Sequence, residues 1–369
     1  MTSSAREHKP RVWIVALVSL MLTTGLVAGA LAAFDGDATV FVSFGATDPS
    51  REYAEQRLGE VVLRGDLGHD GKFFFVQAND PWLLDPANNA AILDFPVYRS
   101  QRMFYPLLAG GLGLFSPEAV VWGLLVVNVI AMALGTLGAA RLARSLGGSP
   151  WWGLAFPANL GFLYALTIDA GGIVAAALAI WAVALIYENR SSPALALLAA
   201  SALTREVMLI TAVGVAIWLW TQNQRRQAFY AVGVPALALG LWEVYIRIRL
   251  GPDQPGIDAL GLPLVGLLRA VPEWINDPLV LVAGGCTLAF MLIYVVRWWT
   301  SRSLLGWAFL GFVPLSFLMT EKVWRLLFDF TRAVGPLMTA TILLVFVEGK
   351  RSGSSTRREL TEATPGRRS

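Results

Sequence analysis

Apolar residues occupy most of this chain in long stretches that no polar period interrupts. Val12–Phe34, Val120–Ala140 and Leu279–Val296 are apolar all round, whereas a surface helix of a soluble protein keeps a polar face. Stretches of roughly 17–25 apolar residues can cross a bilayer, so the pattern predicts an all-α polytopic membrane protein with about ten transmembrane helices. The expected spans are 12–34, 118–140, 151–168, 171–187, 193–204, 206–221, 228–246, 278–296, 304–320 and 333–348.

The composition of the chain points to the same class of protein. It is 56 % hydrophobic and 15 % charged, with a mean hydropathy of +0.57, whereas soluble domains are about 45–50 % apolar. The net charge of +3 comes from bases that cluster in short segments between the apolar stretches. Such clustering indicates membrane topology and argues against nucleic-acid binding. Cys286 is the single cysteine, which excludes an intrachain disulfide and a cysteine-rich metal site.

These basic segments predict the orientation of the chain, because Lys and Arg concentrate in cytoplasmic loops. We expect a multi-pass protein of the cytoplasmic (inner or plasma) membrane with both termini in the cytoplasm. Residues 1–348 would form one membrane domain, 35–117 its large first extracytoplasmic loop, and 349–369 a disordered basic cytoplasmic tail. The clusters that this orientation places inside are Arg6, Lys9, Arg11, Arg141, Arg144, Arg190, Arg225, Arg226, Arg297, Arg302 and the tail.

One apolar segment, 103–115, fits this orientation only if it does not span the membrane. Its length of about thirteen residues, at roughly 1.5 Å per residue, is too short for a bilayer core of about 30 Å. The segment also contains Pro106 and three glycines. We expect a re-entrant or interfacial helix here.

The first external loop contains a carboxylate between two glycines. Asp70 precedes the aromatic run Phe73–Phe75, so it could occupy a partly desolvated pocket that raises its basicity, as suits a general base. The alternative is a tight turn, because Asp-Gly is a common turn dipeptide. His69 and Lys72 are the candidate supporting residues beside it.

Two arginines close the same loop. Arg99 and Arg102 are three residues apart, which on a helical turn places both guanidinium groups on one side. They lie directly before the apolar segment that follows, at the expected lipid interface. This position suits the binding of a phosphate group, and it equally suits an anchor that snorkels to lipid headgroups.

Ionisable residues also interrupt two later apolar regions. Arg205 and Glu206 break the hydrophobic run between 194 and 220, and Asp329 and Arg332 lie at the start of the last predicted span. Charges in such places mark a functional site or a structural ion pair, because an isolated charge in the membrane is costly. Both interpretations stay open for each pair.

Other signatures are weak or missing. Asp35 and Asp37 form an Asp-x-Asp pair that could hold a divalent cation, although the pattern is frequent by chance. Asp169 is expected at a helix end. His8 and His69 are the only histidines, so a His-rich metal cluster is excluded, and neither a Walker loop nor a Gly-x-Ser-x-Gly elbow occurs. Hydrolases and nucleotide-driven pumps are therefore disfavoured.

Taken together, the charged motifs resemble a bacterial branch of the polytopic type C (GT-C) glycosyltransferases over about residues 12–348. The resemblance lies in Gly68–Phe74, Arg99–Leu108, Leu203–Glu206 and Asp329–Arg332. It implies a GT-C-like membrane enzyme that transfers a sugar, a hexose such as mannose or a pentose, from a polyprenyl-phosphate donor. The acceptor would be a glycan, lipid or protein of the cell envelope, outside the cytoplasmic membrane.

The resemblance also implies roles for residues. Family members use an acidic residue of the first external loop as base, and Asp70 has this position. It would accept the proton of an acceptor hydroxyl while the oxygen attacks and inverts the anomeric carbon, and Arg99, Arg102, Arg205 and Arg332 would stabilise the departing phosphate. No cofactor is required, and a divalent cation stays open. The chain departs from the family near 169, where members often have an acidic pair.

Two other classes of function remain. A transporter or flippase for a lipid-linked sugar would use the same arginines to bind the headgroup without breaking a bond. A non-catalytic scaffold for the assembly of an envelope glycopolymer would use the charged loop to recruit partners. Transporters often contain internal repeats, and the sequence shows none of useful length.

Overall fold

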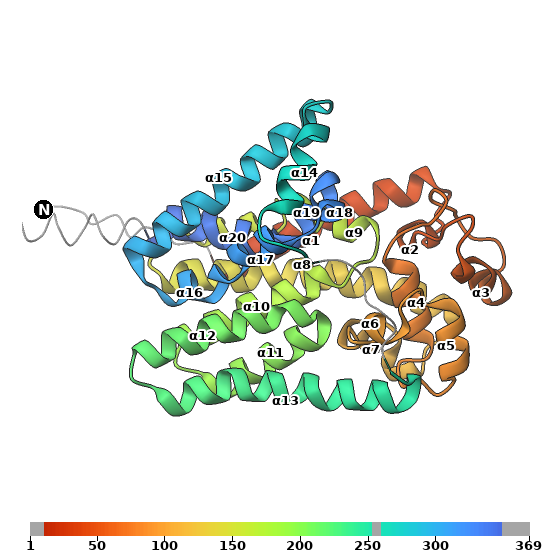
Figure 1. The fold of residues 1–369 in the computed structure, drawn as a ribbon, viewed down its shortest axis with the longest axis horizontal. Coiled ribbons are helices and arrows are strands. Elements are labelled where there is room, and N and C mark those ends of the chain that lie inside the picture. Colours follow the sequence, from red (N-terminus) through yellow and green to blue (C-terminus); the bar gives the residue numbers. More distant parts are fainter. Residues whose placement is uncertain (1–10, 253–259, 349–369) are drawn as a thin grey trace, which may run out of the picture.

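The computed structural model describes residues 11–252 and 260–348, and in these residues it is helical, with two isolated β-bridges and no longer strand. Its longest helices run lengthwise through the molecule (Figure 1): α1 (Val12–Ala33), α8 (Pro117–Ser145), α13 (Arg225–Leu250) and α15 (Pro278–Ser301). Each is long and apolar enough to cross a membrane. The prediction of an all-helical chain is therefore confirmed for the described residues, and these four helices are candidate membrane spans.

A bent pair of helices gives a fifth candidate span. α19 (Leu327–Ala333) meets α20 (Gly335–Leu343) at 58°, and a π-helical turn, η4 (Leu344–Glu348), continues α20. The count of about ten spans stays a prediction, since it needs helices shorter than the roughly 17–25 residues of a full span. The shorter apolar helices are α10 (Gly172–Tyr187), α11 (Ser191–Thr204), η3 (Glu206–Met208) with α12 (Leu209–Thr221), and α16 (Leu304–Leu310) with α17 (Phe312–Leu318).

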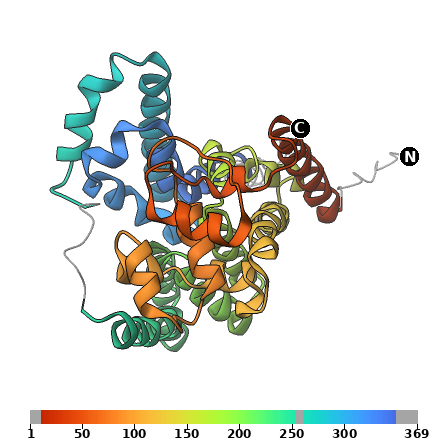
Figure 2. The same cartoon turned by 90° about the vertical axis from the view of Figure 1, so that its right-hand side faces the viewer.

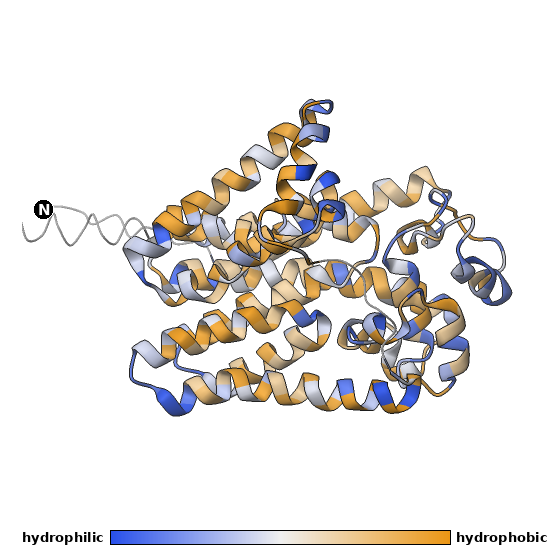
Figure 3. Cartoon of the chain, in the orientation of Figure 1, coloured by the Kyte–Doolittle hydropathy of each residue, from blue (hydrophilic) through white to orange (hydrophobic). Residues whose placement is uncertain are grey.

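α10 lies at the centre of the bundle. Nearly all of its residues are buried, and its many alanines let α8 and α11 pack closely against it. In contrast, α13 and α15 expose apolar side chains such as Leu241 (64 %) and Leu292 (66 %). Hydrophobic residues cover the length of these helices, and hydrophilic residues gather at the ends of the molecule (Figure 3). Such a surface is expected of helices that face lipid.

The long segment between α1 and α8 folds into a cap at one end of the bundle (Figures 1 and 2). Asp48 and Asp85 start two of its helices: each side chain accepts a hydrogen bond from a backbone N–H of the first turn, and a proline follows at the first helical position. The cap contains α2 (Thr39–Val42), α3 (Pro49–Leu58), α4 (Gly71–Asn79), α5 (Pro86–Ile92), α6 (Pro96–Ser100), α7 (Phe104–Ala109) and η1 (Gly111–Gly113).

The region 103–115 contains only the six-residue α7 and the single turn η1. Both are too short to cross a bilayer core of about 30 Å. Leu112, Leu114 and Phe115 at its end are exposed. The re-entrant or interfacial position of this region stays a prediction.

The segment 151–168, expected as one helix, is broken. It forms a 3-10 helix, η2 (Pro150–Ala155), and a separate helix, α9 (Leu160–Thr167). Pro157 disfavours a continuous helix, and the side chain of Asn159 caps α9 by accepting a hydrogen bond from the Gly161 N–H. The remaining helices are α14 (Val265–Trp274) and α18 (Glu321–Arg325). The tail 349–369 and the basic residues Arg6 and Lys9 lie outside the described residues.

Candidate functional site

Asp70 stands at the start of α4, in a turn that its glycine neighbours make possible. Gly68 has a φ of +64°, and a Cβ there would lie 2.2 Å from the Ser43 carbonyl oxygen. A Cβ on Gly71 would lie 2.6 Å from the Ile168 carbonyl oxygen. Glycine at both positions therefore lets the backbone pack closely on either side of Asp70. The Asp70 side chain does not cap its own helix, so its carboxylate is available to other partners.

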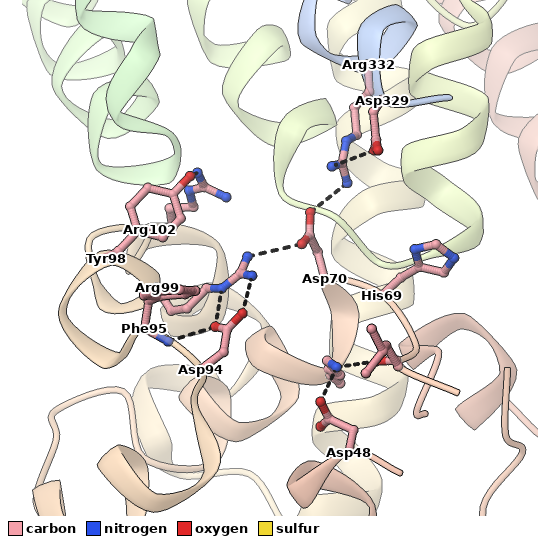
Figure 4. A network of polar contacts seen from close by, with 12 residues as sticks. Asp48, His69, Asp70, Asp94, Phe95, Tyr98, Arg99, Arg102, Asp329 and Arg332 are labelled. Atoms are coloured by element: carbon pink, nitrogen blue, oxygen red, sulfur yellow. Dashed lines mark hydrogen bonds and ion pairs between the residues drawn. The ribbon is translucent and has the colours of Figure 1, made fainter. Parts of the chain in front are cut away.

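Two arginines from distant segments hold this carboxylate (Figure 4). Arg99 Nη1 lies 3.2 Å from Asp70 Oδ1, and Arg332 Nη1 lies 2.6 Å from Oδ2. Each arginine has a second carboxylate: Asp94 accepts two hydrogen bonds of 2.8 Å from Arg99, and Asp329 Oδ1 lies 3.3 Å from Arg332. These three carboxylates and two arginines form one chain of ion pairs that links the cap to α19.

This arrangement corrects the expectation that the pocket raises the basicity of Asp70. Burial alone raises its pKa, but the guanidinium groups of Arg332, Arg99 and Arg102 outweigh burial and hold the pKa well below its usual value. The carboxylate is therefore ionised and a weak base as long as both arginines hold it. For Asp70 to act as a general base, another anion must compete for these arginines and so weaken their ion pairs with the carboxylate.

Arg102 belongs to a second ion pair. Its guanidinium binds both oxygens of Glu206, at 3.0 and 3.1 Å, and also the hydroxyl of Tyr98. This pair joins the end of the cap to the break between α11 and α12. Glu206, a candidate supporting residue, therefore forms its ion pair with Arg102 and not with its neighbour Arg205, and Arg99 and Arg102 bind different carboxylates.

Arg205 differs from Arg99, Arg102 and Arg332, because no ion pair or side-chain hydrogen bond joins its guanidinium to another described residue. Burial lowers its pKa to about 10, the charges of Arg102 and Arg332 act in the same direction, and the charge of Glu206 only partly offsets them. The group stays protonated at neutral pH. A half-buried cation among other cations is unfavourable without an anion.

Arg205 lines a small cavity, the arginine cavity, beside Asp70. Its volume is about 30 Å³, where roughly 10–15 Å³ holds one water. The cavity thus has room for a phosphate-sized group but not for a sugar ring. Three guanidinium groups face one carboxylate there, so the cavity favours an anion. Its lining residues are Asp70, Phe74, Arg102, Ala170, Gly171, Gly172, Thr204, Arg205 and Arg332.

The remaining candidates lie elsewhere. Lys72 is buried, and its ammonium group donates hydrogen bonds to Asp48 and to the Leu67 carbonyl oxygen, not to Asp70. Asp37 accepts a hydrogen bond from the Thr39 N–H, and within 11–252 and 260–348 no three His, Cys, Asp or Glu side chains gather as metal ligands. Asp169 is fully buried between α9 and α10, and this burial raises its pKa well above the usual value.

Sequence reasoning missed two groups that hold the arginines, Asp94 and Tyr98. Asp94 lies five residues before Arg99, a spacing that predicts no contact on a continuous helix. The contact forms because α6 starts only at Pro96, which turns the chain back toward Asp94. His69, expected beside Asp70, turns instead to Tyr164, whose hydroxyl lies 3.4 Å from its ring nitrogens.

Fold and site together define a helical membrane protein with an arginine–carboxylate site where its polar cap meets the bundle. Comparison with protein-family models, curated protein sequences and solved structures gave no match.

Proposed function

We propose that this protein is a membrane glycosyltransferase of the GT-C type. It would transfer a sugar from a polyprenyl-phosphate donor to a cell-envelope acceptor on the extracytoplasmic face. The observation that carries the proposal is Asp70 on the wall of a phosphate-sized cavity that also contains the unpaired Arg205. A carboxylate beside an arginine that has no ion pair among the described residues suits a reaction that removes a proton and releases a phosphate.

The proposed reaction is a single displacement. The acceptor oxygen forms a bond to the anomeric carbon, the bond from that carbon to the phosphate oxygen breaks, and the phosphate leaves with the electron pair. Asp70 takes the proton of the acceptor hydroxyl. Arg205 and Arg332 stabilise the charge that develops on the leaving phosphate.

The ion pairs of Asp70 fit this sequence of events. A donor phosphate in the arginine cavity competes for Arg332, which lies 2.6 Å from Asp70 Oδ2 in the ligand-free site. Weakening this pair removes the largest favourable charge on the carboxylate and returns basicity to it. Asp70 would then act as a base only when the donor is bound.

The finer topology belongs to the same proposal. With about ten crossings, the shorter helices α10, α11 and α12 also count as spans. Both termini then lie in the cytoplasm, and the cap with the arginine cavity faces outward. The lipid tail of the donor would lie along the exposed apolar helices.

Cysteine accessibility tests this topology. In a Cys286→Ala background, a Ser116→Cys variant should react with a membrane-impermeant maleimide in intact cells. Asn223→Cys, in the turn between α12 and α13, should react only after permeabilisation. Cytoplasmic labelling of position 116 would contradict the orientation and the non-spanning 103–115 segment.

The function itself is tested by the envelope glycans of a strain that lacks the protein. We expect one sugar to be reduced or missing and to return when the wild-type protein is supplied. The lipid-linked donor of that sugar should accumulate in the deficient strain. An unchanged glycan composition would refute the proposed transfer.

A further inference from the structure

A second, larger cavity is lined by His69, the chain neighbour of Asp70, and by Asp329, the partner of Arg332. Its volume is about 540 Å³, within the range of roughly 300–1,000 Å³ typical of ligand sites. We call it the Tyr164 cavity. Its walls come from the loop before α4, from α9, from the α14–α15 junction and from α18–α19, with lining residues Arg64, His69, Tyr164, Glu273, Asp277, Leu279, Val280, Arg325, Leu326, Leu327, Phe328 and Asp329.

The Tyr164 cavity combines an aromatic surface with hydrogen-bond acceptors. The rings of Tyr164 and Phe328 stack with centroids 4.3 Å apart and an angle of 16° between their planes. The phenol hydroxyl of Tyr164 lies 3.4 Å from the His69 ring nitrogens. Aromatic faces pack against the C–H faces of sugar rings, while polar groups around them bind hydroxyls.

Three carboxylates of this cavity each keep an oxygen for a ligand. Asp329 binds Arg332 through Oδ1, Glu273 binds Arg325 through Oε2, and Asp277 accepts the first N–H groups of α15 through Oδ1. The second oxygen of each has no partner among the described residues. An ionised carboxylate is an acceptor only, so these oxygens suit hydroxyl donors and disfavour a phosphate.

The Tyr164 cavity and the arginine cavity share no lining residue but meet at one wall. Asp329 lines the first, Asp70 and Arg332 line the second, and Arg332 contacts both carboxylates. His69, next to Asp70 in the chain, turns into the Tyr164 cavity, on the side of Asp70 away from Arg99 (Figure 4). A hydroxyl held in the Tyr164 cavity beside Asp329 is therefore one ion-paired arginine, Arg332, away from Asp70.

We infer that the Tyr164 cavity binds the acceptor and that this acceptor is a carbohydrate. The inference rests on the proposed function and narrows its acceptor from glycan, lipid or protein to a glycan. Leu279, Val280, Leu326 and Leu327 complete the wall, and its three carboxylates and two arginines offer hydrogen-bond partners that a lipid tail would leave unused. A neutral polyhydroxylated ring matches both the aromatic stack and the free acceptor oxygens.

Binding to the full-length protein in nanodiscs tests this site. The first probe is an oligosaccharide fraction released from the envelope of a strain that lacks the protein, since this glycan retains vacant acceptor positions. The second probe is undecaprenyl phosphate. Tyr164→Ala should weaken oligosaccharide binding about tenfold or more, because it removes the stacking face, and should leave undecaprenyl phosphate binding unchanged.

Two variants complete the design. Arg205→Ala should weaken undecaprenyl phosphate binding and leave oligosaccharide binding unchanged. Tyr164→Phe keeps the ring and the local packing, so it should bind the oligosaccharide more tightly than Tyr164→Ala and controls for misfolding. Failure of the wild-type protein to bind the oligosaccharide, equal binding by Tyr164→Ala, or equal weakening by Arg205→Ala would overturn the inference.

These outcomes are separate from failure of the proposed function. The proposed function fails if loss of the protein leaves envelope glycans unchanged. The acceptor site fails if a sugar is missing as proposed but Tyr164→Ala binds the oligosaccharide fraction as tightly as wild type does.

Discussion

Asp70→Asn is expected to lower the rate of sugar transfer by about 10²–10⁴, the usual contribution of a general base. The amide keeps the size of the carboxylate but cannot accept the proton of the acceptor hydroxyl. It also loses the negative charge that Arg99 and Arg332 now contact. The measurement is the initial rate of sugar transfer in isolated membranes, with wild-type and variant protein at equal abundance.

Asp66→Asn is the matched control for this substitution. Asp66 lies in the same loop, four residues before Asp70, and is exposed. This variant should transfer sugar at the wild-type rate. If Asp70→Asn retains more than about one tenth of that rate, the general-base role is refuted.

Arg205→Ala is expected to weaken the binding of undecaprenyl phosphate by about 10- to 100-fold. The estimate corresponds to one charge-assisted hydrogen bond of about 1.5–3 kcal/mol. The same substitution removes a cation that Arg102 and Arg332 repel, so the ligand-free protein should unfold at an equal or higher temperature. Binding by native mass spectrometry and thermal unfolding in detergent measure the two effects.

Measuring both lipid-phosphate binding and unfolding temperature separates a ligand-binding role of Arg205 from a structural one. A residue that binds a ligand at a site of like charge weakens the ligand-free fold, whereas a structural residue stabilises it. Arg269→Ala, an exposed arginine on α14, should change neither quantity. A lower unfolding temperature for Arg205→Ala with unchanged lipid-phosphate binding would remove Arg205 from the site.

The sequence was informative where a charge stands in an apolar or glycine-rich setting. Asp70, Arg205 and Arg332 could be selected in this way, because burying a charge is costly and is rarely accidental. The helical class could be predicted from apolar stretches such as α8 and α15, because a segment in lipid must pair its own backbone N–H and C=O groups. Predicting which charges pair was a different problem.

Pairing depends on contacts between segments far apart in the chain. Asp70 and Arg332 are 262 residues apart, and Arg102 and Glu206 are 104 apart, so no local pattern encodes these contacts. The lowered pKa of Asp70 follows from such pairs and therefore contradicted the expectation from its loop alone. The Tyr164 cavity was missed because its walls come from several segments with no common motif.

The most direct test of the account is the envelope sugar content of a strain that lacks the protein and is complemented at matched membrane abundance. Wild type and Asp66→Asn should restore the missing sugar, and Asp70→Asn should not, while its lipid-linked donor accumulates. Equal restoration by Asp70→Asn would contradict the account, because a protein that only moves or recruits a lipid-linked sugar does not need a proton acceptor at this position.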